Sequence, residues 1–376
     1  MCIFLIFDLM LFIMVFLYDD KNRKLYFWIG AAVLFVLLGM HNGTGDPRGY
    51  GYDYPHYLNF FLGRNDMYGS VDSPSTYTLE WPYYYFCKFL RIFGNYNYVY
   101  IIGFCLFVNI PFLIFVKKYS KLAPLSVLWL FIIQNTETHL FINSTHRQMV
   151  AHAFFMVAVL ILLSIDFKVD WHRYKIEFLA IALCLLIAVL GHSSSYFVIV
   201  MLLAVYFMPS LKKRTQIITV LASMIIGLFL FDKFSGYLNN LMLLLGDIEE
   251  VGRTTHYLVD DVYDSGKASF NALFPQTLMT IGVIYFSDEE ERKTLFTKCL
   301  FLATVLVNIF FTVPLISRSL TTLWIIAITG CIPKAFKNDT KGRIALAVIL
   351  IIQLYTAYKA YSSPSFRMLP FKFIWE

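Results

Sequence analysis

Charged residues are scarce in this chain. Asp, Glu, Lys and Arg make up only 15% of its 376 residues, whereas 59% are hydrophobic and the mean hydropathy is +0.64. A soluble domain of this length does not carry so much apolar sequence. The composition therefore excludes a soluble enzyme and gives no reason to expect a nucleic-acid partner. It predicts an all-α protein that crosses the lipid bilayer many times.

Cysteine and metal-binding motifs are also lacking. The six cysteines lie mostly inside apolar runs and form no Cys-x-x-Cys pair, so the sequence predicts neither a disulfide framework nor a zinc site. The polar segments expected outside the membrane contain no Asp-x-Asp pair. We therefore favour a reaction that needs no metal or other cofactor, although Asp260, Asp261 and Asp264 leave a metal site open.

What the sequence does have is a series of long apolar runs. Several are shorter than the roughly 20 residues that cross a bilayer without tilting, so Tyr, Trp and polar neighbours must complete them. We predict about twelve transmembrane helices on this basis. The runs cover residues 2–17, 25–40, 98–116, 122–136, 148–165, 178–190, 196–208, 216–231, 270–286, 299–316, 320–332 and 344–361.

Basic residues predict how these helices are oriented. Clusters of Lys and Arg occupy six short connections, and such clusters favour the cytoplasmic side. They fall on one side only if residues 80–93 do not cross the membrane, which predicts an interfacial or re-entrant helix there. The expected organisation is a single integral membrane domain over residues 1–376 with both termini outside. It has an outer loop at 41–97, which contains the interfacial helix, and a long outer loop at 232–269.

The segment 41–57 is the most distinctive polar stretch. It is rich in Gly, Pro and Tyr and follows an apolar run of membrane-spanning length. Its Gly and Pro residues exclude a continuous helix, so the backbone is free to arrange Arg48, Asp53 and Tyr57 around a polar ligand. The alternative is a solvated loop that joins two transmembrane helices.

Four arginines close to the ends of apolar runs fall on the expected outer side: Arg48, Arg147, Arg253 and Arg318. Arg147 and Arg318 each follow Ser or Thr residues where a helix is expected to begin. Free backbone N–H groups, the positive end of the helix dipole and a guanidinium together suit a phosphate or diphosphate. The alternative for any one of them is an ion pair with an outer carboxylate.

A third expected helix start of this kind contains His192. It lies in Gly191-His192-Ser193-Ser194-Ser195, between two short apolar runs. Because these runs are short, we expect His192 to lie below the lipid headgroups, where a polar side chain is costly and usually functional. A turn histidine without a chemical role is the alternative.

The ordered set of polar motifs resembles the EpsG family of bacterial exopolysaccharide proteins, which is close to the Wzy-type repeat-unit polymerases. The resemblance rests on Arg48-Gly-Tyr-Gly-Tyr-Asp53-Tyr-Pro-His-Tyr57, on Leu79-Glu80-Trp-Pro82-Tyr-Tyr84, on Arg147-Gln148, and on Gly191-His192-Ser193-Ser194. It covers roughly residues 25–207 in order and spacing, and beyond that only hydropathy and Arg318 support it.

This resemblance implies a GT-C-like membrane glycosyltransferase that polymerises lipid-linked oligosaccharide repeat units of an O-antigen, capsule or exopolysaccharide. Such an enzyme transfers a glycan from one polyprenyl (undecaprenyl) diphosphate to the acceptor sugar of another, at the outer face of the bacterial cytoplasmic membrane. Its expected partners are these two lipid-linked oligosaccharides, the bilayer and a chain-length regulator.

The reaction needs cations for the leaving diphosphate and a base for the acceptor hydroxyl. Arg147 and Arg318 suit the first role, with Arg48 and Arg253 in support, and Tyr57 and Gln148 belong to the same substrate-binding motifs. Glu80, Asp53 and His192 are the candidate bases, with the two carboxylates ahead of the histidine.

Two other functions share these features. A flippase or transporter of lipid-linked glycans would also place arginine near a diphosphate, but it should show charges within its transmembrane helices and an internal repeat. Neither is evident in the sequence. An outer-face glycan ligase or acyltransferase would share the arginine and histidine sites and differ only in its acceptor.

Overall fold

The computed structural model describes the chain in separate segments, and every element within them is helical, without a β-strand. The prediction of an all-α protein is therefore confirmed for the described residues. These are residues 2–17, 20–39, 54–64, 69–72, 81–120, 146–165, 174–192, 194–229, 270–310, 320, 323–324, 326–327 and 329–362.

The helices follow the predicted apolar runs. α1 (Cys2–Leu17) and α14 (Phe270–Phe286) have the predicted bounds, and the other long helices differ by a few residues at their ends. The run 122–136 lies outside the described residues. The other long helices are α2 (Arg23–Gly39), α5 (Asn97–Tyr119), α8 (His146–Leu162), α9 (Lys175–Gly191), α10 (Ser194–Phe207), α11 (Lys213–Phe229), α16 (Leu295–Phe310) and α19 (Thr340–Ser362).

Among the described residues, α5 is the one helix that is both long and apolar enough to cross a membrane, and four shorter apolar helices accompany it. Twelve membrane crossings therefore stay a prediction. By its contacts the chain divides into two compact units. The first unit comprises Met1–Tyr196 with Ala357–Glu376, and the second comprises Phe197–Thr356.

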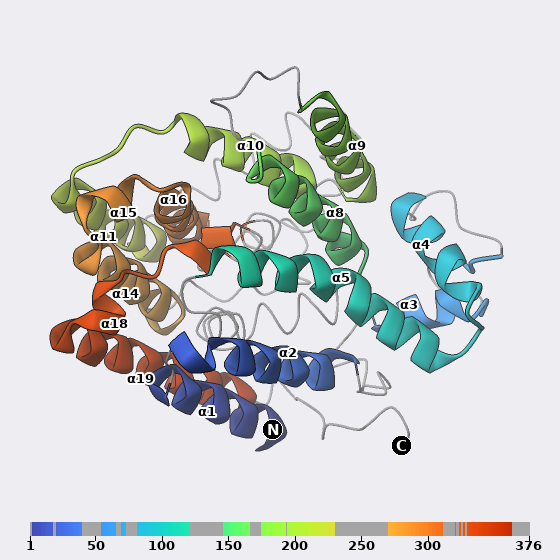
Figure 1. Cartoon of the computed structure of the whole chain (residues 1–376), viewed down its shortest axis with the longest axis horizontal. Helices are drawn as coiled ribbons and strands as arrows, with labels where there is room; N and C mark the ends of the chain where they lie inside the picture. The colour runs from blue at the N-terminus through green and yellow to red at the C-terminus, as the bar shows by residue number, and fades with distance from the viewer. Residues whose placement is uncertain are drawn as a thin grey trace. The chain divides into compact units, whose positions relative to one another are not determined.

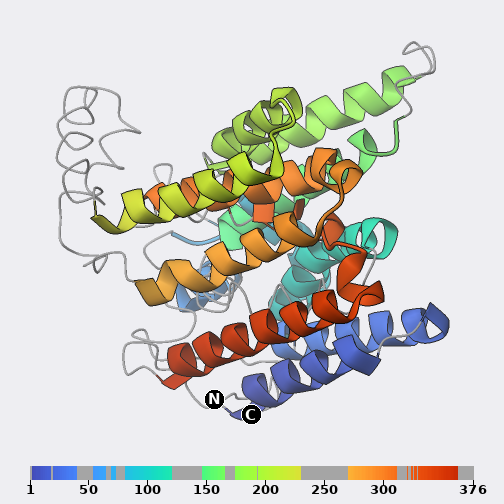
Figure 2. The same ribbon diagram turned by 90° about the vertical axis from the view of Figure 1, so that its left-hand side faces the viewer.

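The first unit is a series of packed helices. α1 and α2 lie side by side (Figure 1 and Figure 2), α2 packs on α5, α5 on α8, and α8 on α9. The Arg23 guanidinium donates a hydrogen bond to the Ser120 carbonyl at 2.6 Å, which ties the start of α2 to the end of α5. The close approach of α9 to α8 needs Gly191, because a Cβ there would lie 2.9 Å from the Ala151 Cβ.

Two short helices, α3 (Tyr54–Phe61) and α4 (Trp81–Arg91), complete this unit. At 11 residues, α4 is about half as long as a transmembrane helix, in keeping with a segment 80–93 that does not cross. It buries Tyr83 and Phe86 on one face and exposes Trp81 and Tyr85 on the other. An interfacial position for α4 stays a prediction.

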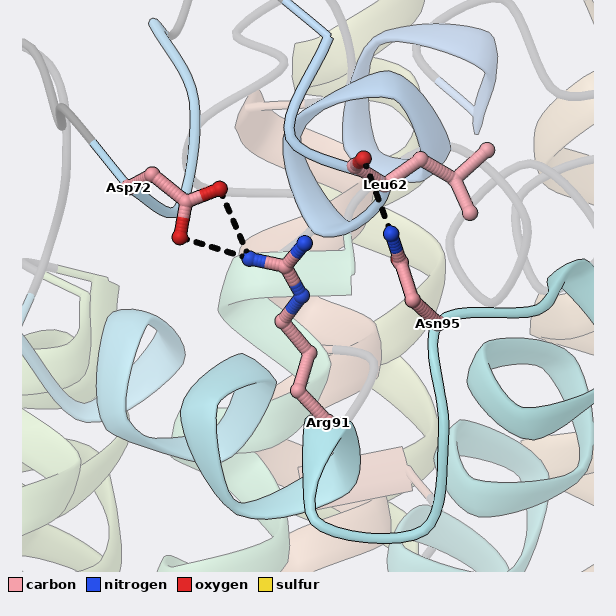
Figure 3. A network of polar contacts seen from close by, with 4 residues as sticks. All are labelled: Leu62, Asp72, Arg91 and Asn95. Atoms are coloured by element: carbon pink, nitrogen blue, oxygen red, sulfur yellow. Dashed lines mark hydrogen bonds and ion pairs between the residues drawn. The ribbon is translucent and has the colours of Figure 1, made fainter.

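The end of α4 is held by polar contacts (Figure 3). The Arg91 Nη1 donates to both carboxylate oxygens of Asp72, at 2.8 and 2.9 Å, and the Asn95 amide donates to the Leu62 carbonyl at 3.3 Å. The hydrogen bond from Arg91 lowers the pKa of Asp72 below its ordinary value. Gly63 makes the adjacent turn with φ of +77°, a backbone conformation that glycine adopts without strain.

In the second unit, α11, α14 and α16 pack against one another (Figure 2) around a buried polar network. The Asn308 amide donates to the Ser223 Oγ at 3.1 Å and to the Thr277 Oγ1 at 3.0 Å. The Thr280 and Thr304 hydroxyls are hydrogen-bonded to each other at 2.6 Å. The short helices of this unit are α15 (Glu289–Lys293) and α18 (Ala335–Asn338).

Candidate functional site

His146, the first residue of α8, is enclosed by aromatic rings and is only 1% exposed. The rings of Tyr57 and Phe104 lie nearly parallel to its imidazole, with centroids 4.9 and 3.9 Å away. The Tyr54 ring meets it edge-on at 5.0 Å. These contacts come from α3 and α5, so packing between distant segments of the chain fixes the first residue of α8.

A chain of hydrogen bonds reinforces this position. The Nδ1 of His146 is 2.6 Å from the Tyr100 hydroxyl, and that hydroxyl is 2.7 Å from the hydroxyl of Tyr83 on α4. All three groups are buried. The next residue after His146 is Arg147, a half-buried side chain in the first turn of α8. The packed imidazole therefore fixes the backbone from which Arg147 extends.

The opposite side of the α8 start faces the turn between α9 and α10. The amide of Gln148, which is 3% exposed, donates to the Ser194 Oγ at 2.9 Å. The same oxygen lies 2.7 Å from the His192 Nδ1 and 3.4 Å from the His152 Nε2. Gln148 and His152 are four residues apart on α8 and thus share one face of the helix.

His192 itself forms a tight turn. Its backbone is extended, with φ −171° and ψ 132°, and its N–H donates to the Ala188 carbonyl at 3.1 Å as the cap of α9. Its carbonyl accepts from the Ser195 N–H at 3.0 Å in the first turn of α10. The predicted helix start after Gly191 is therefore confirmed, and both hydrogen bonds fix His192 in the turn between α9 and α10.

The structure brings four of the predicted site residues into one region of the first unit. Tyr57 contacts His146, Arg147 and Gln148 follow it along the chain, and Gln148 is linked to His192 through Ser194. The other predicted site residues lie outside the described residues, and their roles stay predictions. They are Arg48, Asp53, Glu80, Arg253 and Arg318.

Sequence reasoning gave no role to His146, Tyr83, Tyr100 and Ser194. A signal for His146 was present, since it directly precedes Arg147-Gln148. The tyrosines lie in clusters that anchoring at the membrane surface explains equally well. Tyr100 lies 46 residues before His146 in the sequence, and this separation concealed their hydrogen bond.

Chemically, this region combines a cation, amide and hydroxyl groups, and imidazoles. Within the described segments, no three His, Cys, Asp or Glu side chains come together as metal ligands. Asp260, Asp261 and Asp264 lie outside those segments. The arrangement is suited to holding an oxyanion, because guanidinium and amide groups donate to oxygen and the start of α8 carries a partial positive charge.

Comparison with known proteins gives a family. The family model described as EpsG family matches residues 31–373. Neither the curated proteins nor the solved structures contain a match. The match spans nearly the whole chain and includes α8 and the His192 turn. The chain therefore belongs to the EpsG family, a membrane-associated family of Wzy-type polymerases in polysaccharide biosynthesis.

Proposed function

We propose that this protein polymerises lipid-linked oligosaccharide repeat units at the extracytoplasmic face of the bacterial cytoplasmic membrane. It transfers a glycan from one polyprenyl diphosphate to the acceptor sugar of another. Family membership supports the reaction class. The observation that carries the proposal for the site is the hydrogen-bonded link from Gln148, which follows Arg147 in the first turn of α8, through Ser194 to His192.

The reaction requires groups that stabilise the leaving diphosphate and a base that accepts the proton of the acceptor hydroxyl. The acceptor hydroxyl attacks the anomeric carbon of the donor, the bond from that carbon to the diphosphate oxygen breaks, and the lipid diphosphate leaves with the electron pair. Charge develops on the leaving oxygens, so cationic and N–H groups placed there lower the barrier. Arg147 and the α8 N-terminus take this role in our proposal. Arg318 is the second cation, with Arg48 and Arg253 in support.

The proton of the acceptor hydroxyl goes to a carboxylate. Asp53 precedes Tyr54 in the sequence, and Tyr54 on α3 contacts His146. Glu80 precedes Trp81, the first residue of α4, and Tyr83 on the same helix is linked to His146 through Tyr100. Because α3 contacts His146 and α4 is linked to it through Tyr100, we propose either carboxylate as the base and rank both ahead of His192.

The proposal places this site on a GT-C-like scaffold of about twelve transmembrane helices, with the loops of Arg48, Arg147, His192, Arg253 and Arg318 on the outer side. The apolar helices in both units and the membrane association of the family support it. Labelling of single engineered cysteines from each side of the membrane tests the topology. Labels near Arg48 and Arg147 that react from opposite sides would contradict it.

The test of function is a polymerisation assay. Purified protein in liposomes receives a lipid-linked repeat unit without any nucleotide sugar, and the products are separated by size. We expect a ladder of polymers. Movement of the substrate across the bilayer without a ladder would indicate a transporter instead. Transfer of a single glycan to a different acceptor would indicate a ligase.

A further inference from the structure

The His192 imidazole is held by hydrogen bonds that determine which ring nitrogen carries its proton. The backbone N–H of Ser194 donates to the His192 Nδ1 at 3.1 Å. A backbone N–H can only donate, so Nδ1 must be the acceptor. In a neutral imidazole the other nitrogen then carries the hydrogen. The main chain of this turn therefore selects the form of His192 that is protonated at Nε2.

The neighbouring side chains agree with this direction. The Gln148 NH₂ group donates to the Ser194 Oγ at 2.9 Å, which occupies a lone pair of that oxygen. The hydroxyl hydrogen of Ser194 is then available for the His192 Nδ1, 2.7 Å away. The hydrogen bonds thus run from Gln148 through Ser194 to His192, and both contacts of Ser194 leave Nδ1 an acceptor.

This form is unsuited to a base. A base needs a lone pair directed at the proton it accepts, whereas the Nδ1 lone pair already accepts from Ser194 and Nε2 carries hydrogen. We infer that His192 is a hydrogen-bond donor, through Nε2–H, to a phosphate oxygen of the leaving diphosphate. The inference rests on the proposed function for the identity of this ligand.

The choice of a phosphate oxygen rests on the role proposed above for Arg147 and the first turn of α8. Gln148, which is linked to His192 through Ser194, directly follows Arg147 in the first turn of α8. The guanidinium, the N–H groups of this turn and an Nε2–H are all donors. Phosphate oxygens are acceptors only, whereas sugar hydroxyls also donate, so a site made of donors favours the phosphate.

The tautomer can be measured without any activity assay. Histidine labelled with ¹⁵N in the purified protein shows by NMR which ring nitrogen carries hydrogen, and loss of a signal in His192→Gln assigns it. We expect a protonated Nε2 and an unprotonated Nδ1 at neutral pH. A proton on Nδ1 of neutral His192 would overturn the inference.

The ligand is tested with a short-chain polyprenyl diphosphate, and the matching polyprenyl alcohol is the uncharged control. His192→Ala should weaken diphosphate binding by about tenfold or more, since a hydrogen bond to a charged group is lost. His192→Gln should recover most of it, because its amide NH₂ reaches toward the Nε2 position. The shorter side chain in His192→Asn should not. Binding of the alcohol should be equal in all four proteins.

The polymerisation assay distinguishes a hydrogen-bond donor at position 192 from a base. If His192 is a donor, His192→Gln should form more polymer than His192→Ala. If all the variants bind the diphosphate like the wild type and Gln is as inactive as Ala, His192 is the base and the inference is wrong. If the wild type forms no ladder, the polymerase assignment fails. The NMR and diphosphate measurements then still decide the role of His192.

Discussion

Each unit of this protein contains a buried polar network between apolar helices, but the two networks differ in chemistry. In the first unit the network joins Gln148, Ser194, His152 and His192. In the second it is centred on Asn308 and contains only amide and hydroxyl groups among the described contacts. Amides and hydroxyls offer fixed donors and acceptors, whereas an imidazole can present either ring nitrogen as the donor.

From this difference we expect the second network to serve helix packing and the first to serve function. Hydrogen bonds between apolar helices stabilise their association, and neutral groups suffice for that purpose. The Asn308 network in the second unit fits this role. The first unit has imidazoles at the same kind of helix junction, and Gln148 of this network directly follows Arg147 in α8. Substitutions in the first network should therefore affect activity, and substitutions in the second should affect stability.

The largest expected effect is on activity and concerns Arg147. Arg147→Ala should lower the initial rate of polymerisation by about 100-fold, because charge on the leaving diphosphate is no longer neutralised. Arg147→Lys should recover little of the rate if two parallel hydrogen bonds are needed. Arg214→Ala, an exposed arginine at the start of α11, is the control. Full activity in both Arg147 variants would remove this residue from the site.

The second prediction concerns helix packing in the second unit. A Cβ at Gly227 would collide with the backbone carbonyl of Asn308, so Gly227→Ala should destabilise the protein by about 1–3 kcal/mol. At Gly282 the nearest atom is the end of the flexible Ile349 side chain, at 2.7 Å. Gly282→Ala should therefore cost less. Thermal unfolding in detergent measures both, and equal unfolding temperatures would contradict the prediction.

A smaller effect is expected for Asn308→Leu. The variant keeps a side chain of similar size and removes donors to Ser223 and Thr277. Hydrogen bonds between membrane helices average about 0.6 kcal/mol, so we expect a loss of about 1–2 kcal/mol. Polymerisation well below the unfolding temperature should be unchanged. A large drop in activity of the folded variant would show that the second network also has a functional role.

The smallest effect concerns the ion pair at the end of α4. Arg91 lowers the pKa of Asp72, so the ionised carboxylate stabilises the fold above the ordinary pKa of Asp, and this contribution is lost as the pH falls through the lowered value. Because Asp72 is 63% exposed, Asp72→Asn should cost only about 0.2–1 kcal/mol at pH 7. The difference from wild type should shrink as the pH falls below the ordinary pKa of Asp and vanish once Asp72 is protonated. A constant difference across the pH range would contradict the assignment.

The helices could be predicted from the sequence because apolar runs of this length have few alternatives in a membrane. The runs at α1 and α14 give the observed bounds, and the turn at His192 follows from Gly191 and the serines. The site was predicted only in part. Arg147, Gln148 and His192 could be chosen from local patterns, because each lies near the start of a helix or in a turn.

The contacts that join these residues could not be predicted. Gln148 and Ser194 are 46 residues apart, and the rings around His146 come from α3 and α5. Local patterns carry little information about such pairs when long helices such as α5 and α9 are apolar on nearly all sides, since no polar face indicates which neighbour each one meets. The same limit applies to the tyrosines, because surface anchoring and a buried hydrogen bond to His146 require the same residue type.

The most direct test of the central claim is polymerisation by wild type, Arg147→Ala and Arg214→Ala in the same liposomes, with lipid-linked repeat units and no nucleotide sugar. We expect a ladder from wild type and Arg214→Ala, and almost none from Arg147→Ala although it remains folded. Absence of a ladder from folded wild-type protein would contradict the polymerase assignment. A normal ladder from Arg147→Ala would contradict the proposed site at the start of α8.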